Sequence, residues 1–157
     1  MRIEAAISEC RGLMSDLTPP LLYEVGLATA LKGFASRQAE LNQIEIEVEA
    51  EGFSDTLCDS LKGMLFQSAR ELVMNAMKHA DPSRVLIRLS SFDSRLALEV
   101  IDDGDGFDSD DTDLFDADDS GGFGLFNIRE RVSSVGGGIE LESTPKQGTK
   151  ARIEVPV

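Results

Sequence analysis

The sequence predicts an α+β fold: a two-layer α/β sandwich with a mixed, mostly antiparallel sheet, helices on one face, and a helical segment in front. The first observation is the order of the patterns, which is helix, helix, strand, helix, strand, strand, long loop, helix, strand, strand. The second is the length of 157 residues, which suits about one domain of roughly 150 residues. Hydrophobic residues make up 41% of the chain, as in ordinary soluble globular proteins.

The first third of the chain contains two helical patterns and one strand. Apolar residues recur at helical spacing over residues 2–16, and Pro19-Pro20 ends that segment. A second helical run begins at Leu21 and fades in the polar stretch 36–43. Residues 44–50 alternate between apolar and polar side chains, which predicts a half-buried strand with a solvated face made of Glu45, Glu47 and Glu49.

The longest predicted helix spans residues 56–80 and ends at Asp81-Pro82. Residues 102–124 are rich in Asp and Gly and have no periodicity, so they form a long loop, a feature that is usually functional or disordered. The other predicted elements are strands over 84–91 and 96–101 joined by a turn, a helix over 125–135, and strands over 139–143 and 150–157.

Charge is the unusual property of the composition. The formal net charge is −14, which disfavours nucleic acid and anionic membrane surfaces as partners. No apolar run approaches the ~20 residues of a membrane span, and the N-terminal residues do not form a signal peptide. Cys10 and Cys58 are expected to be reduced, packed thiols, and a single histidine makes a zinc site improbable.

The helix over 56–80 carries a polar strip beside its apolar stripe. At about 100° per residue, Glu71, Asn75, Lys78 and His79 lie near one another on the helix surface. One interpretation is a solvated face with (i, i+4) pairs. The other is a hard-cation site, in which the Asn75 oxygen binds Mg²⁺ and the two basic side chains meet phosphates.

Asp102-x-Gly104-x-Gly106 follows a predicted strand directly. The glycines permit a tight turn and a close approach of backbone to a ligand, and the carboxylate can accept hydrogen bonds from an amino group. An ordinary Asp/Gly turn is the alternative. The spacing and the missing glutamate exclude an EF-hand calcium loop.

Two further glycine clusters follow. Gly121-Gly122-Phe123-Gly124-Leu125 opens a helix, where free N–H groups favour phosphate, although a flexible hinge is equally compatible with it. This cluster is neither a Walker A loop nor a dinucleotide fingerprint. Gly148-Thr149 precedes the last strand and taken alone is only a turn.

Together, in this order, the four motifs resemble the ATP-binding boxes of the GHKL (Bergerat-fold) ATPases over residues 44–157. The ending Lys78-His79-Ala80 is typical of sensor histidine kinases. Residues 124–131 resemble the G-L-x-x-I-x-E-R segment of the nitrate-sensor-like subfamily, and residues 17–27 resemble its junction after the dimerisation helices.

The resemblance implies roles for the matched residues. Asp102 would accept a hydrogen bond from the adenine amino group, with Thr149 in support. Asn75 would bind Mg²⁺, and Glu71 would orient a metal-bound water or act as a base, so these two form the catalytic pair. The implied ATP-binding residues are Asn75, Lys78, His79, Asp102, Gly104, Gly106, Gly122, Gly124, Leu125 and Thr149. Arg129 and Arg131 stand at similar family positions without an expected contact to ATP.

The resemblance also implies a division of the chain. Residues 1–20 would be the end of a dimerisation helix and its Pro-Pro junction, and residues 21–157 the catalytic domain with a lid at about 105–123. The family's phosphoacceptor histidine lies on a separate helix, so His79 is expected to hold phosphate, with a structural role as the alternative. Seven lid carboxylates should weaken ATP binding unless they face solvent or Mg²⁺: Asp108, Asp110, Asp111, Asp113, Asp116, Asp118 and Asp119.

The expected function is therefore that of an ATP-dependent protein-histidine kinase fragment. It would use ATP and Mg²⁺ and transfer the γ-phosphate to a histidine on the dimerisation domain of the same kinase. A response regulator would be the next partner, and the domain would be cytoplasmic without direct membrane contact. The alternatives are an anti-sigma-factor-type serine kinase and a non-enzymatic module that senses ATP.

Overall fold

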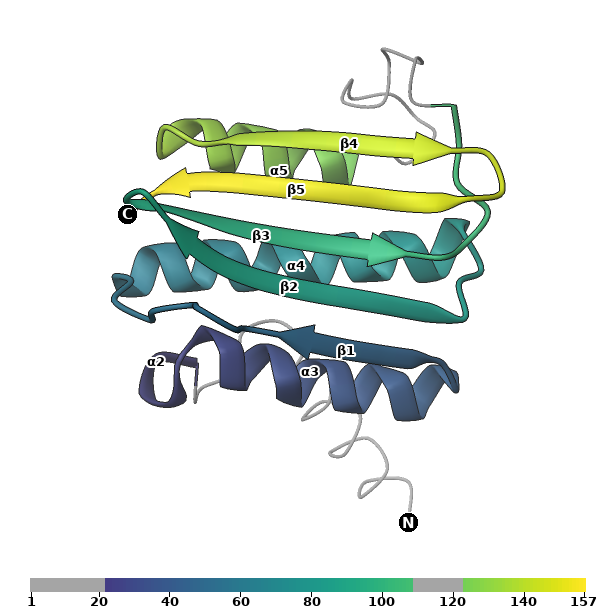
Figure 1. The fold of residues 1–157 in the computed structure, drawn as a ribbon, viewed down its shortest axis with the longest axis horizontal. Helices are drawn as coiled ribbons and strands as arrows, with labels where there is room; N and C mark the ends of the chain where they lie inside the picture. The colour runs from purple at the N-terminus through teal and green to yellow at the C-terminus, as the bar shows by residue number, and fades with distance from the viewer. Residues whose placement is uncertain (1–21, 109–122) are drawn as a thin grey trace, which may run out of the picture.

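Five strands form one sheet in the order β1-β2-β3-β5-β4 in the computed structural model, which describes residues 22–108 and 123–157 (Figure 1). The strands are β1 (Glu45–Glu49), β2 (Arg84–Phe92), β3 (Arg95–Asp102), β4 (Gly138–Thr144) and β5 (Gly148–Pro156). The helices are α2 (Leu22–Val25), α3 (Leu27–Asn42), α4 (Asp59–His79) and α5 (Phe123–Ser134).

The pairing of the strands confirms a mixed, mostly antiparallel sheet. β1 and β2 are parallel and are connected through α4, whereas β2–β3, β3–β5 and β5–β4 are antiparallel. The helices α4 and α5 cover one face of the sheet, and α3 packs beside β1 and α4 (Figure 1). This is the predicted two-layer sandwich.

The core lies between the sheet and α4. Successive side chains of a strand point to opposite faces of the sheet, so alternate residues of β2, β3 and β5 face the helices and are buried. They are Val85, Ile87, Leu89, Leu96, Leu98, Val100, Ala151, Ile153 and Val155. From α4, Leu65, Phe66, Ala69 and Val73 are fully buried against them. Phe34 of α3 packs edge-on against Phe66, with 6.0 Å between the ring centroids.

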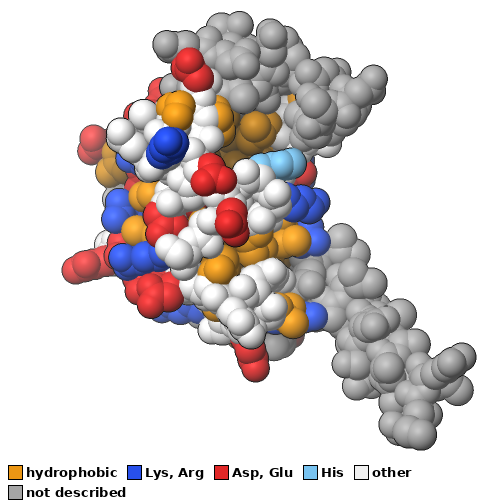
Figure 2. Space-filling view, turned by 90° about the vertical axis from the view of Figure 1, so that its right-hand side faces the viewer, with side chains coloured by type: hydrophobic (Ala, Val, Ile, Leu, Met, Phe, Trp, Pro, Cys, Tyr) orange, Lys and Arg blue, Asp and Glu red, His pale blue; other side chains and the backbone are white. Residues whose placement is uncertain are grey.

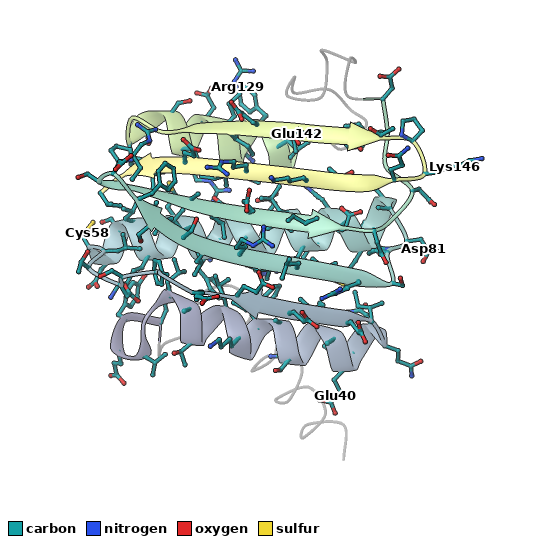
Figure 3. All side chains as sticks on the ribbon, in the orientation of Figure 1. Glu40, Cys58, Asp81, Arg129, Glu142 and Lys146 are labelled. Atoms are coloured by element: carbon teal, nitrogen blue, oxygen red, sulfur yellow. The ribbon has the colours of Figure 1, made fainter. Side chains whose placement is uncertain are left out.

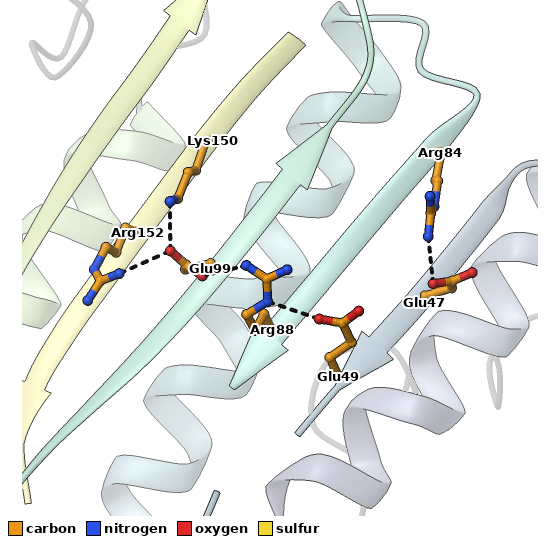
Figure 4. A network of polar contacts seen from close by, with 7 residues as sticks. All are labelled: Glu47, Glu49, Arg84, Arg88, Glu99, Lys150 and Arg152. Carbon is orange, nitrogen blue, oxygen red and sulfur yellow. Dashed lines mark hydrogen bonds and ion pairs between the residues drawn. The ribbon is translucent and has the colours of Figure 1, made fainter. Parts of the chain in front are cut away.

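The face of the sheet opposite the helices carries an ion-pair network centred on Glu99 of β3 (Figure 4). Its buried carboxylate meets Lys150 at 2.9 Å, Arg152 at 3.1 Å and Arg88 at 3.3 Å. Arg88 continues to Glu49 of β1 at 2.9 Å. Burial by itself would raise the pKa of Glu99, but the hydrogen bonds from Lys150 and Arg152 outweigh it and hold that pKa below its ordinary value.

Three details differ from the sequence-based expectations. The second helical run does not fade at residue 36, because α3 continues to Asn42. The glutamates of β1 are more than a solvated face, since Glu47 pairs with Arg84 at 2.8 Å and Glu49 with Arg88. Cys58 is a free thiol but is exposed, not packed, and precedes α4 at the end of the molecule away from Asp81 and Lys146 (Figure 3).

Several expectations fall on residues outside the described ranges. These are the helical segment at 1–20 with Cys10, Gly122, most of the predicted lid, and six of its seven carboxylates. Within residues 22–108 and 123–157, no helix combines the length and the apolar content needed to cross a membrane.

Candidate nucleotide-binding site

The end of α4, the loop after β3 and the β4–β5 hairpin meet at one end of the sheet. The Asp105 N–H donates to the Ala80 carbonyl at 2.7 Å, which ties the loop to the end of α4. The Lys146 N–H donates to the Asp105 carbonyl at 2.6 Å, which ties the loop to the hairpin. In the ladder, Asp102 stands directly opposite Thr149. Three motifs that are far apart in sequence are thus brought together.

Asp102 is the buried carboxylate of this end, with 8% of its surface exposed. One carboxylate oxygen accepts the Gly104 N–H at 2.9 Å, and the carboxylate also accepts the Thr149 N–H. Burial raises the pKa of Asp102 above its ordinary value, because these two hydrogen bonds only partly offset the lost hydration. A buried acceptor of this kind suits an amino group of a ligand.

Gly104 and Gly106 allow the loop to make its close contacts. A Cβ on Gly104 would overlap the Ala80 carbonyl oxygen, and one on Gly106 would overlap the Thr144 carbonyl oxygen. Gly106 also has φ +61°, which disfavours other residues. Close packing against protein backbone therefore explains both glycines. An approach to a nucleotide would be a second reason for them.

Asp103, which the sequence-based reasoning missed, fastens the same loop. Its carboxylate accepts the Ser83 N–H at 2.8 Å, the Ser83 hydroxyl at 2.5 Å and the Arg84 N–H at 2.9 Å. These hydrogen bonds, the one from the Ser83 side chain first, hold the pKa of Asp103 below its ordinary value. The adjacent acidic pair was visible in the sequence, but its partners lie about twenty residues away and only the fold places them.

The polar strip of α4 divides in the structure. Glu71 and Asn75 are half-buried and face the start of α5, where a Cβ on Gly124 would lie 2.5 Å from Glu71 Oε1 and 3.4 Å from Asn75 Nδ2. Lys78 and His79 are exposed in the last turn of α4. Figure 2 shows the histidine at the surface of this end of the molecule. Glu71 and Asn75 therefore contribute to the contact between helices, whereas Lys78 and His79 are accessible basic side chains.

Arg131 of α5 reaches the same carboxylate. Its guanidinium donates to Glu71 Oε2 at 3.2 Å and to the Asn127 carbonyl at 3.2 Å. Arg131 and Gly124 are seven residues apart and so lie on one face of α5. The sequence pattern pointed to Arg131 without a partner, and the structure assigns it Glu71. Leu125, expected at the nucleotide, packs partly buried against the hydrophobic core.

An open cavity of about 180 Å³ lies beside the hairpin. Its lining includes Ile101, Glu142 and Lys150, which stand at positions of the face away from the helices. It also includes Asp102, Ser143 and Thr149, which stand at positions of the helix face. The cavity therefore borders Asp102 and Thr149 at this end of the sheet.

The donor set on α4 suits a hard cation held jointly with phosphate. The Asn75 side chain makes no hydrogen bond to another described residue, so its amide oxygen is available, and Mg²⁺ prefers oxygen ligands. No cluster of three or more acidic, His or Cys side chains able to hold a metal occurs within residues 22–108 and 123–157. Magnesium at this place would complete its shell with phosphate and water oxygens.

Comparisons with known proteins identify the family of the chain. The family described as histidine kinase-, DNA gyrase B- and HSP90-like ATPases matches residues 61–157. A sensor-like histidine kinase of Chloroflexus aurantiacus is 36% identical over 153 residues, 95% of this chain and 25% of that protein. The sensor histidine kinases MctS of Rhizobium johnstonii and ComP of Bacillus subtilis are 32% and 33% identical, over 98% and 95% of this chain.

This chain spans 32% of MctS and 19% of ComP. Among solved structures, full-length ShkA in complex with AMPPNP has a TM-score of 0.72 at 26% identity, over 83% of this chain and 29% of that one. The histidine kinase domain of the Erythrobacter litoralis EL346 blue-light activated kinase has a TM-score of 0.68 at 23% identity. The match covers 83% of this chain and 60% of that one. The chain belongs to the family of histidine kinase-, DNA gyrase B- and HSP90-like ATPases, and its relatives are sensor histidine kinases.

Proposed function

We propose that this chain is the catalytic domain of a two-component sensor histidine kinase, working in the cytoplasm. It binds Mg-ATP and transfers the γ-phosphate to a histidine on the dimerisation helices of the same kinase. A response regulator then receives the phosphoryl group. The observation that carries the proposal is the buried carboxylate of Asp102 at one end of the sheet, with Glu71 and Asn75 on the adjacent helix.

In this proposal the base and the phosphates occupy different parts of the site. The adenine amino group donates to Asp102, with Thr149 in support directly or through water. The phosphates lie toward Asn75, Lys78 and His79, and the segment around Gly122 and Gly124 closes over them. Gly104 and Gly106 keep the loop backbone beside the nucleotide. Magnesium, held by the Asn75 oxygen, supplies charge neutralisation on the phosphates.

The chain's own residues mainly position the reactants. Transfer breaks the bond between the γ-phosphorus and the bridging oxygen of ADP and forms a bond to an imidazole nitrogen. Most of the catalysis is then alignment and charge compensation. Glu71 orients a water beside the phosphates, or acts as a base when water is the attacker. Arg131 fixes the direction of the Glu71 carboxylate.

The direct test mixes this chain with a fragment that carries the dimerisation helices and the acceptor histidine. With labelled ATP and Mg²⁺, we expect label on that histidine. At subsaturating ATP, we expect about ten- to hundredfold slower labelling when Asp102→Asn weakens the adenine contact. Nucleotide binding without any labelling of the acceptor fragment would refute kinase activity for this domain and favour a module that only senses ATP.

A further inference from the structure

Ser143 of β4 is a buried hydroxyl that no part of the proposed mechanism uses. It has 7% of its surface exposed and lies between the loop after β3 and the start of β5. Its Oγ accepts the Phe107 N–H at 2.8 Å. The same oxygen lies 3.1 Å from the Gly148 carbonyl oxygen and 2.8 Å from the hydroxyl of Thr149.

Counting protons fixes the direction of these hydrogen bonds. A serine hydroxyl has one proton and two acceptor positions. The Phe107 N–H occupies one acceptor position, and the Gly148 carbonyl can only accept, so it requires the Ser143 proton. The contact to Thr149 is then satisfied only when Thr149 donates to Ser143. In that arrangement every group is paired, as burial demands.

The direction of that bond decides what Thr149 offers to a ligand. Having given its proton to Ser143, the Thr149 hydroxyl can only accept. Thr149 stands opposite Asp102 in the β3–β5 ladder, so the two side chains share the helix face of the sheet. Their oxygens then form a pair of acceptors at the place where we put the base.

We propose that Ser143 is a positioning residue that holds the Thr149 hydroxyl as an acceptor, so that the site selects a 6-amino purine over a 6-oxo purine. A 6-amino group supplies protons to both oxygens, directly or through a water. A 6-oxo group presents an acceptor to two acceptors and is rejected. This inference rests on the proposed ATP site and adds to it the residue that sets base selectivity.

The test compares the dissociation constants of Mg-ATP and Mg-ITP for the full chain by calorimetry. Wild type should prefer ATP. Ser143→Ala frees the Thr149 proton to face the base, so we expect weaker ATP binding, stronger ITP binding, and a ratio that falls about three- to tenfold, the effect of one net hydrogen bond. Ser143→Thr keeps a hydroxyl and should restore the ratio.

Two further variants separate positioning from general damage. If Ser143 acts through Thr149, Ser143→Ala combined with Thr149→Val should give the same ratio as Thr149→Val alone. Ser91→Ala removes another serine that accepts a backbone N–H, from Ser54 at 3.3 Å, and should leave the ratio unchanged. Should Ser143→Ala not fold, Ser143→Cys serves instead, since a thiol is a weak donor of similar shape.

The outcomes are distinct. An unchanged ATP-to-ITP ratio in Ser143→Ala, or additive effects of the Ser143→Ala and Thr149→Val changes, overturns the inference while the ATP site stands. Wild-type protein that binds neither nucleotide overturns the proposed function itself.

Discussion

At the scale of single residues, Asp102 combines a stability cost with a binding role. Its carboxylate is buried and its only described donors are the backbone N–H groups of Gly104 and Thr149. No cation compensates the charge among the hydrogen bonds and ion pairs of the described residues. Replacing this carboxylate should therefore change both ligand affinity and stability, which gives two predictions.

The first prediction concerns affinity. Asp102→Asn should weaken Mg-ATP binding about ten- to hundredfold, because a hydrogen bond to a charged group contributes about 1.5–3 kcal/mol. Calorimetric titration measures this directly. Unchanged ATP affinity in the variant would show that adenine does not bind at Asp102.

The second prediction concerns pH and stability. The pKa of Asp102 is raised in the folded protein, so folding favours the protonated form. The wild type therefore loses stability as pH rises from the ordinary aspartate pKa of about 3.9 through the raised folded value. The Asn variant does not titrate there. The melting temperature of Asp102→Asn minus that of wild type should increase over this pH range, and a constant difference would contradict the assignment.

At the scale of elements, the contact between α4 and α5 places Gly124 against Glu71 and Asn75. A Cβ at residue 124 would lie 2.5 Å from Glu71 Oε1, so the carboxylate, whose other oxygen accepts from Arg131, must shift. We expect Gly124→Ala to keep the fold and to slow phosphotransfer about 10- to 100-fold, since misplacement by about 1 Å has effects of that size. The labelling assay with the acceptor fragment measures the rate.

Gly33 is the matched control for that substitution. It also lies within a helix, α3, but a Cβ there meets nothing within 4 Å. Gly33→Ala should leave the phosphotransfer rate unchanged and raise the free energy of unfolding by about 0.5–1 kcal/mol, the usual gain in a helix interior. Equal rates for the two alanine variants would remove the role that we assign to the α4–α5 contact.

The ion pairs on the sheet should differ in how much they contribute to the free energy of unfolding. Glu99 is buried among three cations, whereas Glu47 and Arg84 are each 52% exposed in their side chains. Glu99→Gln should lower the free energy of unfolding by about 1.5–3 kcal/mol, while Glu47→Gln should change it by less than about 1 kcal/mol. Urea denaturation of both variants makes the comparison. Similar losses in the two would mean that burial does not strengthen the Glu99 network.

The same network has a defined pH dependence. The pKa of Glu99 is lowered in the folded protein, so its contribution is present above the ordinary glutamate pKa of about 4.3 and is lost as pH falls through the folded value. Wild type and Glu99→Gln should therefore converge in stability toward acid pH.

At the scale of the whole molecule, a net charge of −14 opposes the binding of a polyanion. Neutralisation by Mg²⁺ should therefore be needed in addition to the contacts with the base. We expect chelation of Mg²⁺ by EDTA to weaken ATP binding more than tenfold and to leave the binding of uncharged adenosine unchanged. Asn75→Ala should reduce this dependence on Mg²⁺. Equal ATP affinity with and without Mg²⁺ would argue against the metal site at Asn75.

Much of the fold could be predicted because its strands and helices have clean periodicity. Alternation placed Val85, Ile87 and Leu89 on the inner face of β2, and all three are buried. The end of α3 could not be placed from the polar stretch 36–43, because a polar surface helix and a loop have similar composition. The subfamily assignment, the division at residue 20 and the roles of the site residues stay predictions.

The element order, the inner faces of the strands and the four motifs can be read from the sequence, since these depend on local spacing and on which residues tolerate tight turns. Which side chains meet depends on the packing of the folded chain. The partners of Asp103, Ser143, Arg131 and Glu99 come from other segments, up to sixty residues away for Arg131 and Glu71. The physical reason is that directional hydrogen bonds and ion pairs form only after the burial of the apolar faces has fixed strand register and helix position.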